Sequence, residues 1–561
     1  MYNKKHLIGY YILATAILFC APQITRAASQ LDPAALKQWQ DRRFGLFIHW
    51  GPVSLTGREI GWSRGQETPI AEYDQLYKQF NPTQFDADQW AQVASDAGVK
   101  YVVLTTKHHD GFCLWDTRQT DYNIMNTPFK RDVVKELSAA CRNKGIAFGV
   151  YHSTCDWHHP DFPLTSPGGK VKRQIYNLDR YNDYLKAQVK ELLVQYGPLS
   201  TVWFDVPQEF DTVRGQNLID WTRAIQPDII INDRTGAKGD YSTPEQRIGG
   251  FDRQRPWETC MTICQQWSWK PDDKMKSLKE CLQTLLYTIG GDGNLLFNVG
   301  PMPDGRIEPR QVERLQEMGR WVKQYGDGIY GTRGGPFMPG HWGASTCKNN
   351  KIYLYIMNWP KQGPLQLPAV PMEISGAKIQ SGGSFDFQQR QEGLIINVPI
   401  ENRDEIATVI ELTMKGKAFE ITPCLVSISQ SVAFNKKATA SNVFMNNSDY
   451  SAAQVLDDDF RTRWATDAGV KTAWLRIDLN NEKTVAGAMI DEHDWNRVKK
   501  FELQYLDGSD WKTIHAGTTI GQRKRLSFPP VRARAFRLNI LDASEGPTIW
   551  EVQLFEGKEK P

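Results

Sequence analysis

Short apolar runs alternate with amphipathic segments through residues 30–340 of the chain. The apolar runs have the length of buried strands and lie at 44–48, 101–104, 146–151, 201–204, 229–231 and 294–299. The amphipathic segments have helical spacing and lie at 86–97, 132–143, 181–196 and 309–325. Several of them begin with Asp or end just before Gly, which is the capping chemistry that helices prefer. This alternation predicts parallel βα units.

A TIM-like (β/α) barrel at 30–340 is the favoured architecture, and a doubly wound open sheet is the alternative. A dinucleotide-binding sheet would need a glycine-rich turn after its first strand, and none follows residues 44–48. Residues with chemically active side chains follow five of the apolar runs in succession: His49, His108 and His109, Tyr151 and His152, Asp205, and Asn232 to Arg234. Strand ends that converge on one rim are a property of a barrel, so this placement favours the barrel.

The remainder of the chain predicts two further β domains, since 561 residues exceed what one hydrophobic core supports. Residues 341–420 show short alternating strands with Gly and Pro turns, which predicts a small β-sandwich. Residues 426–558 also show short strands separated by turns, which predicts a second β-sandwich or jelly roll. The expected strands lie at 351–357, 394–398, 408–412, 474–479, 501–505, 535–540 and 549–555.

The first 27 residues read as an export signal. Lys4 and Lys5 precede an apolar run at 7–19, and a cleavage site with small residues ends at Ala27. The run is too short to span a membrane, so we expect a secreted or periplasmic protein. Lipid attachment at Cys20 is the alternative, although Phe19 is bulky where a small residue is expected.

Cleavage after Ala27 would leave eight cysteines. Their scattered spacing defines no disulfide framework, so their pairing stays open. Cys260 and Cys264 are not matched by a second cysteine pair or a histidine set, which argues against a zinc site.

Composition favours a carbohydrate partner over nucleic acid or an anionic membrane. The chain is 23% charged with a net charge of +3, which gives no electrostatic reason to expect either of the latter. It contains 19 tryptophans, and flat aromatic faces stack on the C–H faces of sugar rings. Tryptophan-rich β-sandwich cores explain the same surplus without a ligand.

Hydrolysis of a glycosidic bond needs two carboxyl groups placed across the anomeric carbon. Asp205 is the best first carboxylate, because it ends an apolar strand directly after Trp203-Phe204; a helix-capping role is the alternative. For the second carboxyl group, the acid/base residue, the sequence alone supports Glu245 and Glu258 equally. Asp233 is a lesser candidate, because it would pair with Arg234.

His49, His108 and His109 bring three imidazoles to one rim. A metal site is one interpretation, but metal ligands on barrels usually include a carboxylate at matched spacing. Histidines that hydrogen-bond sugar hydroxyls are the favoured interpretation. A pocket that is polar on one wall and aromatic on the other suits a deoxy sugar with a methyl group, and its remaining residues would be Tyr151, Trp203, Arg234 and Trp267.

Two long motifs, at residues 43–51 and 106–115, resemble signatures of glycoside hydrolase family 29, the α-L-fucosidases. Trp203-Phe204-Asp205, Asn232-Asp233-Arg234 and the glycine-containing segment 294–301 agree with that family in order and context. The resemblance covers about residues 36–335 and extends through the adjoining β-sandwich.

The resemblance implies an exo-acting, retaining hydrolase of terminal α-L-fucose on fucosylated glycans, with no catalytic cofactor. It implies Asp205 as nucleophile and favours Glu245 as acid/base, with Glu258 as the alternative. The implied fucose contacts are His49, Glu59, Trp62, His108, His109, Tyr151, Trp203, Arg234 and Trp267. The chain departs from the family at Val206, His152 and 267–269, which puts the aglycone preference in doubt.

The last domain resembles the discoidin-type, galactose-binding-like fold of family 32 carbohydrate-binding modules. The resemblance rests on segments 453–459, 462–464, 474–479 and 550–552. Such modules often hold a structural Ca²⁺, whose oxygen ligands here would be Asp457, Asp459, Thr462 and Glu551. An acidic turn without an ion is the alternative.

Three other functions remain as alternatives. One is a catalytically silent fucose-binding protein, which the presence of Asp205 and both glutamates disfavours. Another is a hydrolase of a related sugar such as galactose, which Trp267 near the methyl position disfavours. The third is a metal-dependent hydrolase built on His49, His108 and His109.

Overall fold

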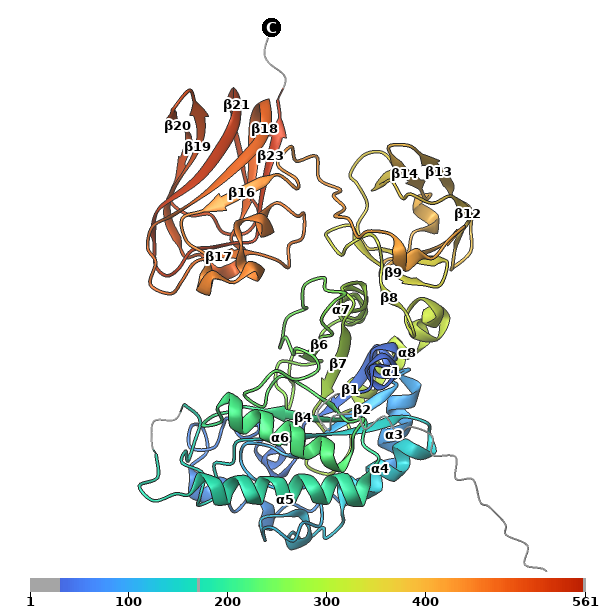
Figure 1. Ribbon diagram of the computed structural model, residues 1–561, viewed down its shortest axis with the longest axis vertical. Helices are drawn as coiled ribbons and strands as arrows, with labels where there is room; N and C mark the ends of the chain where they lie inside the picture. Colours follow the sequence, from blue (N-terminus) through green and yellow to red (C-terminus); the bar gives the residue numbers. More distant parts are fainter. Residues whose placement is uncertain (1–30, 169–171, 558–561) are drawn as a thin grey trace, which may run out of the picture.

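The computed structural model describes residues 31–168 and 172–557, which form a barrel followed by two β units (Figure 1). The predicted signal peptide and Cys20 lie outside these residues. Within them, no helix combines the length and the apolar character needed to cross a membrane. The eight cysteines of this part of the chain form no disulfide bond.

The first unit is built on a sheet of seven parallel strands in the order β5-β4-β3-β2-β1-β7-β6. The strands are β1 (Phe44–Ile48), β2 (Tyr101–Lys107), β3 (Ala147–Ser153), β4 (Thr201–Asp205), β5 (Ile230–Ile231), β6 (Glu258–Thr262) and β7 (Asn294–Val299). Almost all of their residues are buried, which is why they read in the sequence as continuous apolar runs.

An irregular segment, residues 240–246, closes the gap between edge strands β5 and β6. It pairs in parallel with both neighbours, through bridges between Asn232 and Tyr241 and between Glu245 and Cys260. Its backbone amides and carbonyls exchange hydrogen bonds with β6, such as Gln246 N to Cys260 O at 3.0 Å. The predicted barrel is therefore confirmed, and the open-sheet alternative is wrong.

The helices pack around this sheet (Figure 1). They are α1 (Pro33–Arg42), α2 (Ile70–Tyr73), α3 (Ala87–Asp96), α4 (Val133–Asn143), α5 (Leu178–Tyr196), α6 (Thr212–Ile225), α7 (Leu278–Gly290) and α8 (Pro309–Tyr325). The side chains of Asp86 and Asp132 accept the backbone N–H three residues on, so they cap α3 and α4 as the sequence predicted. Helices α1, α2, α6 and α7 and strand β6 were not predicted from the sequence; β6 is buried although it reads Glu-Thr-Cys-Met-Thr.

The second unit is a β-sandwich with its own apolar core. One sheet has the order β12-β15-β10-β9-β8 and the other β11-β14-β13. The strands are β8 (Arg333–Gly334), β9 (Gly343–Lys348), β10 (Lys351–Ile356), β11 (Leu365–Pro368), β12 (Ile374–Ile379), β13 (Asp386–Arg390), β14 (Gly393–Asn397) and β15 (Thr408–Met414).

The third unit is an antiparallel β-sandwich with a separate core around Trp464. Its main sheet has the order β16-β18-β21-β19-β20, with β23 paired to β18, and β17 pairs with β22. The strands are β16 (Lys437–Ala440), β17 (Trp464–Ala465), β18 (Ala473–Asp491), β19 (Val498–Asp507), β20 (Asp510–Gly517), β21 (Lys524–Ala543), β22 (Thr548–Ile549) and β23 (Glu551–Glu556).

A buried ion pair joins the barrel to the second unit. Arg43 precedes β1 and is fully buried; its Nη2 lies 2.7 Å from Asp292 Oδ1. Its Nε donates to the carbonyl of Thr332 at 2.9 Å, and Arg333 also pairs with Asp292. Burial alone would raise the pKa of Asp292, but the two guanidinium groups hold it below its usual value.

Removing one partner of a buried pair leaves the other charge without compensation. We therefore expect Asp292→Ala to lower the free energy of unfolding by about 3–5 kcal/mol in urea titrations. Asp304→Ala is the control, because the Arg306–Asp304 pair is exposed and exposed pairs contribute less than about 1 kcal/mol. Equal effects of the two substitutions would contradict the anchoring role of Asp292.

Candidate active site

The carboxyl ends of the barrel strands bring the predicted residues to one rim. Asp205 is the last residue of β4, and Tyr151 lies on the adjacent strand β3, in register with Trp203. His49 directly follows β1, and His108 and His109 directly follow β2. A parallel barrel therefore gathers residues that are far apart in the chain, as the sequence predicted.

Asp205 is held by three groups. Its Oδ2 accepts a hydrogen bond from the Tyr151 hydroxyl at 2.9 Å, and its Oδ1 lies 2.9 Å from Arg234 Nη1. His109 Nε2 is 3.8 Å from Oδ2. Burial would raise the pKa of Asp205, but Arg234, His109 and the Tyr151 hydroxyl outweigh it and keep the pKa below its ordinary value. Asp205 is therefore a carboxylate at neutral pH.

Arg234 connects Asp205 to Glu245. The same Nη1 atom that contacts Asp205 Oδ1 also lies 2.9 Å from Glu245 Oε2. These two carboxylate oxygens are therefore at most 5.8 Å apart, twice the shared distance. The guanidinium is fixed by Thr243, which accepts from Nε at 2.8 Å, and by the ring of Trp203 at 4.8 Å.

Glu245 stands on the segment that closes the barrel, and its side chain is 42% exposed. Asp205, in contrast, has a side chain that is 13% exposed at the end of a regular strand. The pair thus combines a buried carboxylate with one at the solvent side. Asp233 does not contact Arg234; its oxygens meet Thr243 and Arg255 instead.

Glu258 lies elsewhere, at the amino end of β6 inside the barrel. It is 1% exposed, and its carboxyl group accepts from the Tyr101 hydroxyl and from Trp203 Nε1, the latter at 3.0 Å. Tyr101 is the first residue of β2, so this cluster sits beneath the rim on which Asp205 lies. Burial raises the pKa of Glu258 to about 7. Its position therefore disfavours Glu258 as the acid/base residue, the alternative left open by the sequence.

The three histidines are buried and are held neutral. Burial lowers the pKa of His49 to about 3 and that of His109 to about 4, and it lowers the pKa of His108 as well. His49 Nδ1 lies 2.6 Å from Asn298 Oδ1, and His109 Nδ1 lies 2.7 Å from Ser153 Oγ. Among residues 31–168 and 172–557, no three His, Cys, Asp or Glu side chains are arranged to hold a metal ion.

Aromatic rings lie beside these histidines. The ring of Trp267 lies 4.9 Å from that of His49 and 6.0 Å from that of Phe47. Trp62 is 41% exposed and meets His109 edge-on at 5.3 Å. The side chains around Asp205 thus combine polar imidazoles with flat apolar faces.

Glu59 has a supporting position. Its carboxylate accepts the backbone N–H groups of Trp267 and Ser268, at 2.9 and 3.1 Å, and so fixes the loop that carries the Trp267 ring. Gly300 permits the same loop to approach, because a Cβ there would lie 2.4 Å from the backbone nitrogen of Trp269.

Asn298, Ser153 and Phe47 belong to the site but were not predicted from the sequence. Asn298 orients His49 and donates from Nδ2 to the carbonyl of Trp267 at 2.7 Å. It lies within the motif at 294–301, and a polar residue near the carboxyl end of a mainly apolar strand was the available signal. Ser153 and Phe47 carried no such signal, because their roles depend on which strands are neighbours.

The predicted calcium ligands of the third unit fit a cation only in part. Glu551 Oε2 is buried without a hydrogen-bond partner in the described chain, and Asp457 Oδ2 accepts from Thr462 Oγ1 at 2.8 Å. Burial, together with neighbouring carboxylates, raises the pKa values of Asp457 and Glu551. Asp459, however, is bound by Arg461 through both oxygens.

The raised pKa of Glu258 has a consequence for stability. The unfolded carboxyl group ionises near its ordinary pKa while the folded one stays protonated, so the folded state loses stability as pH rises toward about 7. A pKa difference is equivalent to about 1.4 kcal/mol per unit, so the free energy of unfolding of wild type should fall by on the order of 3 kcal/mol over this pH range. Glu258→Gln has no ionisable group at this position and should not show this decrease. Urea unfolding of both proteins at pH 4.5 and pH 8 measures the difference; parallel pH profiles would contradict the buried, protonated state.

Comparison with known proteins agrees with this geometry. The sequence profile of the family described as "Alpha-L-fucosidase" matches residues 13–327, and that of the "F5/8 type C domain" matches 437–552. Plasma α-L-fucosidase from Pongo abelii is 33% identical over 393 residues, which cover 62% of this chain and 82% of the relative.

Solved structures give the same result. α-L-Fucosidase isoenzyme 1 from Paenibacillus thiaminolyticus is similar with a TM-score of 0.63 and 33% identity, covering 68% of this chain and 99% of that one. A family 29 α-L-fucosidase from Bacteroides thetaiotaomicron is similar with a TM-score of 0.62 and 28% identity, covering 70% and 98%. The chain therefore belongs to the α-L-fucosidases of glycoside hydrolase family 29 and carries a C-terminal domain of the F5/8 type C, or discoidin, family.

Proposed function

We propose that this glycoside hydrolase is an exo-acting, retaining α-L-fucosidase that releases terminal α-L-fucose from oligosaccharides or glycoconjugates through a covalent fucosyl-Asp205 intermediate. The shared Arg234 contact carries the proposal, because it limits the Asp205 and Glu245 oxygens to at most 5.8 Å. Retaining glycosidases hold their carboxyl groups about 5–5.5 Å apart, whereas inverting enzymes need about 6.5–9.5 Å to admit a water molecule.

In the first step, a carboxylate oxygen of Asp205 attacks the anomeric carbon of fucose. The bond from that carbon to the glycosidic oxygen breaks, and the departing oxygen takes a proton from Glu245. Asp205 suits the nucleophilic role because its pKa is held below the ordinary value, so it is ionised without needing a base. Glu245 suits the acid role because it stands at the exposed side, where a leaving group would depart.

In the second step, the Glu245 carboxylate removes a proton from water, and the water oxygen attacks the anomeric carbon. The bond to Asp205 breaks, and fucose leaves with its configuration retained. Once Asp205 is esterified, Glu245 is the remaining carboxylate at Arg234 Nη1, so the guanidinium continues to position it.

The sugar would be recognised by the neutral imidazoles and the aromatic wall. Neutral His49, His108 and His109 offer both donor and acceptor nitrogens to hydroxyl groups. The buried Nδ1 of His108 has no partner in the described chain and is one such group. Trp267 and Phe47 would face the apolar side of the sugar, including its methyl group.

Two further observations support the proposal. The Bacteroides relative was solved as a trapped covalent intermediate in complex with 2-fluoro-fucosyl fluoride. The curated relatives include plasma α-L-fucosidases, which agrees with action outside the cytoplasm, as the export signal at 1–27 predicts.

The decisive experiment compares aryl α-L-fucoside hydrolysis by wild type, Asp205→Asn, Glu245→Gln and Glu258→Gln. Asp205→Asn should lose at least about 10³-fold in activity. A nitrophenol leaving group needs little acid assistance, so the rate of the first step should fall less in Glu245→Gln than in Asp205→Asn. On a poor leaving group, Glu245→Gln should lose about 10²–10⁴-fold, the contribution typical of a general acid.

Glu258→Gln is the matched control, because it makes the same chemical change at the buried glutamate and should retain turnover on both substrates. Turnover that survives Asp205→Asn would reject Asp205 as nucleophile. A leaving-group dependence that appears in Glu258→Gln instead of Glu245→Gln would reverse the acid/base assignment.

The calcium site of the discoidin domain remains a separate proposal, with Asp457, Thr462 and Glu551 as ligands and Asp459 available only if Arg461 releases it. A site with a Kd of about 0.1 mM, typical of extracellular modules, would add about 1.4 kcal/mol of stability at about 1 mM Ca²⁺. Calorimetry with and without Ca²⁺ should show this gain in wild type and not in Glu551→Gln. Identical responses would contradict the site.

A further inference from the structure

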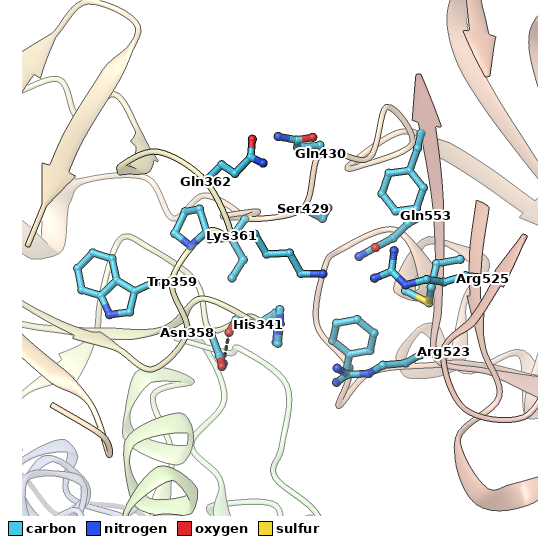
Figure 2. A pocket seen from close by; sticks show the side chains of 15 residues that line it. His341, Asn358, Trp359, Lys361, Gln362, Ser429, Gln430, Arg523, Arg525 and Gln553 are labelled. Carbon is cyan, nitrogen blue, oxygen red and sulfur yellow. Dashed lines mark hydrogen bonds between the residues drawn. The ribbon is translucent and has the colours of Figure 1, made fainter. Parts of the chain in front are cut away.

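A cavity lined by residues distant in sequence from Asp205 lies between the β-sandwich and the discoidin domain (Figure 2). It encloses about 580 Å³. Volumes of about 300–1,000 Å³ are typical of ligand sites. The walls come from the β10–β11 loop, the interdomain linker and the discoidin sheet, and the lining residues used below are Lys361, Gln430, Phe460, Arg523, Arg525 and Phe555.

The walls are held in fixed positions by Asp458, which is 1% exposed. Its Oδ2 accepts from the linker, including Ser427 Oγ at 2.8 Å, and its Oδ1 accepts from Gln553 Nε2 at 3.0 Å. Its carbonyl oxygen accepts from the backbone of His341 in the β-sandwich at 2.8 Å. Asp458 thus contacts the linker, the discoidin sheet and His341, whose carbonyl accepts from Asn358 Nδ2 of the β10–β11 loop at 2.7 Å, so the cavity is a built feature of the domain arrangement.

The cavity is cationic. Lys361 reaches from the β-sandwich side toward Arg523 and Arg525 on the discoidin side (Figure 2). No Asp or Glu belongs to its described lining. The side chains of Lys361 and Arg525 form no ion pair or hydrogen bond within the part of the chain that the structure describes, and the Arg523 contact with Asp491 is long, at 3.8 Å. Such a cluster of cations attracts an anion.

Polar and aromatic groups accompany these charges. Arg525, Met489 and Gln553 lie opposite one another on strands β21, β18 and β23, so they form one row across the outer face of the sheet. Phe460 and Phe555 also line the cavity, and Gln430 contributes an amide. Phe460 also supports Arg523, whose guanidinium lies 4.3 Å from the ring centroid. Amides can hydrogen-bond to sugar hydroxyls, and aromatic rings can pack against the C–H surfaces of sugars.

We propose that this interdomain cavity binds an anionic sugar residue, one that carries a carboxylate or a sulfate group, and so holds acidic glycans on the enzyme. Arg525 would pair with the anionic group through its planar fork and Lys361 as a point charge. The ring of the sugar would lie against Phe460 or Phe555. This function goes beyond cleavage of the fucosidic bond, since none of these residues contacts Asp205 or Glu245.

The test is calorimetric titration of the full chain at about 0.15 M salt, where diffuse attraction is screened beyond about 8 Å. The probes are a galacturonic acid trimer, a 6-sulfated galactose disaccharide, a neutral galactose trimer and inorganic sulfate. Wild type should bind at least one of the two acidic sugars, and the relative affinities of the trimer and the disaccharide distinguish carboxylate from sulfate as the preferred group.

The double variant Lys361→Glu/Arg525→Glu should bind the acidic sugar at least tenfold more weakly. Lys437→Glu/Arg534→Glu is the matched control, because it changes the net charge equally at exposed positions outside the cavity, with Arg534 on the same strand as Arg525. The charge-conserving variant Lys361→Arg/Arg525→Lys should keep binding. Aryl fucoside turnover should be unchanged in all of these variants, which confirms that they fold.

Any one of the following results would overturn the proposal: no saturable binding of either acidic sugar by wild type, equal weakening in the control variant, or equal affinity for the neutral trimer. Inorganic sulfate that binds as tightly as both acidic sugars would also overturn it, since the cavity would then be a simple anion site. Loss of fucoside turnover on Asp205→Asn has no bearing on these outcomes, so the two proposals can fail independently.

Discussion

The barrel can close only because an irregular segment fills the gap between β5 and β6, and the active site depends on that closure. Seven regular strands leave two open edges, and unpaired backbone groups at buried edges are costly. Residues 240–246 satisfy them by pairing with both sides. The same segment carries Thr243, which fixes Arg234, and Glu245, which contacts it. The same segment therefore closes the barrel and brings the two carboxylates together.

Burial raises the pKa values of carboxyl groups inside the barrel, and a charged partner can reverse this shift. Glu258 has only neutral hydrogen-bond donors, so desolvation dominates and its pKa rises. Asp205 is also buried, although it lies nearer the rim, and it faces Arg234, so it stays ionised. Two carboxylates in one barrel thus take opposite protonation states, because one has a guanidinium partner and the other has a tyrosine and a tryptophan.

The two β domains extend the enzyme beyond its barrel. Arg43 and Asp292 anchor the β-sandwich to the base of the barrel, and Arg461 of the discoidin domain lies 3.6 Å from the ring of Tyr287 on α7. Asp458 then fixes the linker between the two β domains. These buried contacts make the three domains a connected scaffold in which interdomain surfaces can be shaped for binding.

The barrel could be predicted from the amino-acid sequence alone, because buried parallel strands are continuous apolar runs. The sequence also placed His49, Tyr151 and Asp205 at strand ends that must converge. It left Glu245 and Glu258 equal on the residues alone, since both follow irregular segments and depth within a barrel has no local signature. The resemblance to family 29 favoured Glu245, and the tertiary structure separated the two residues by bringing Glu245 to Arg234 and Glu258 to the indole nitrogen of Trp203. It alone also revealed Asn298 as the partner of His49 and the cationic cavity, because contacts between distant segments depend on packing and not on periodicity.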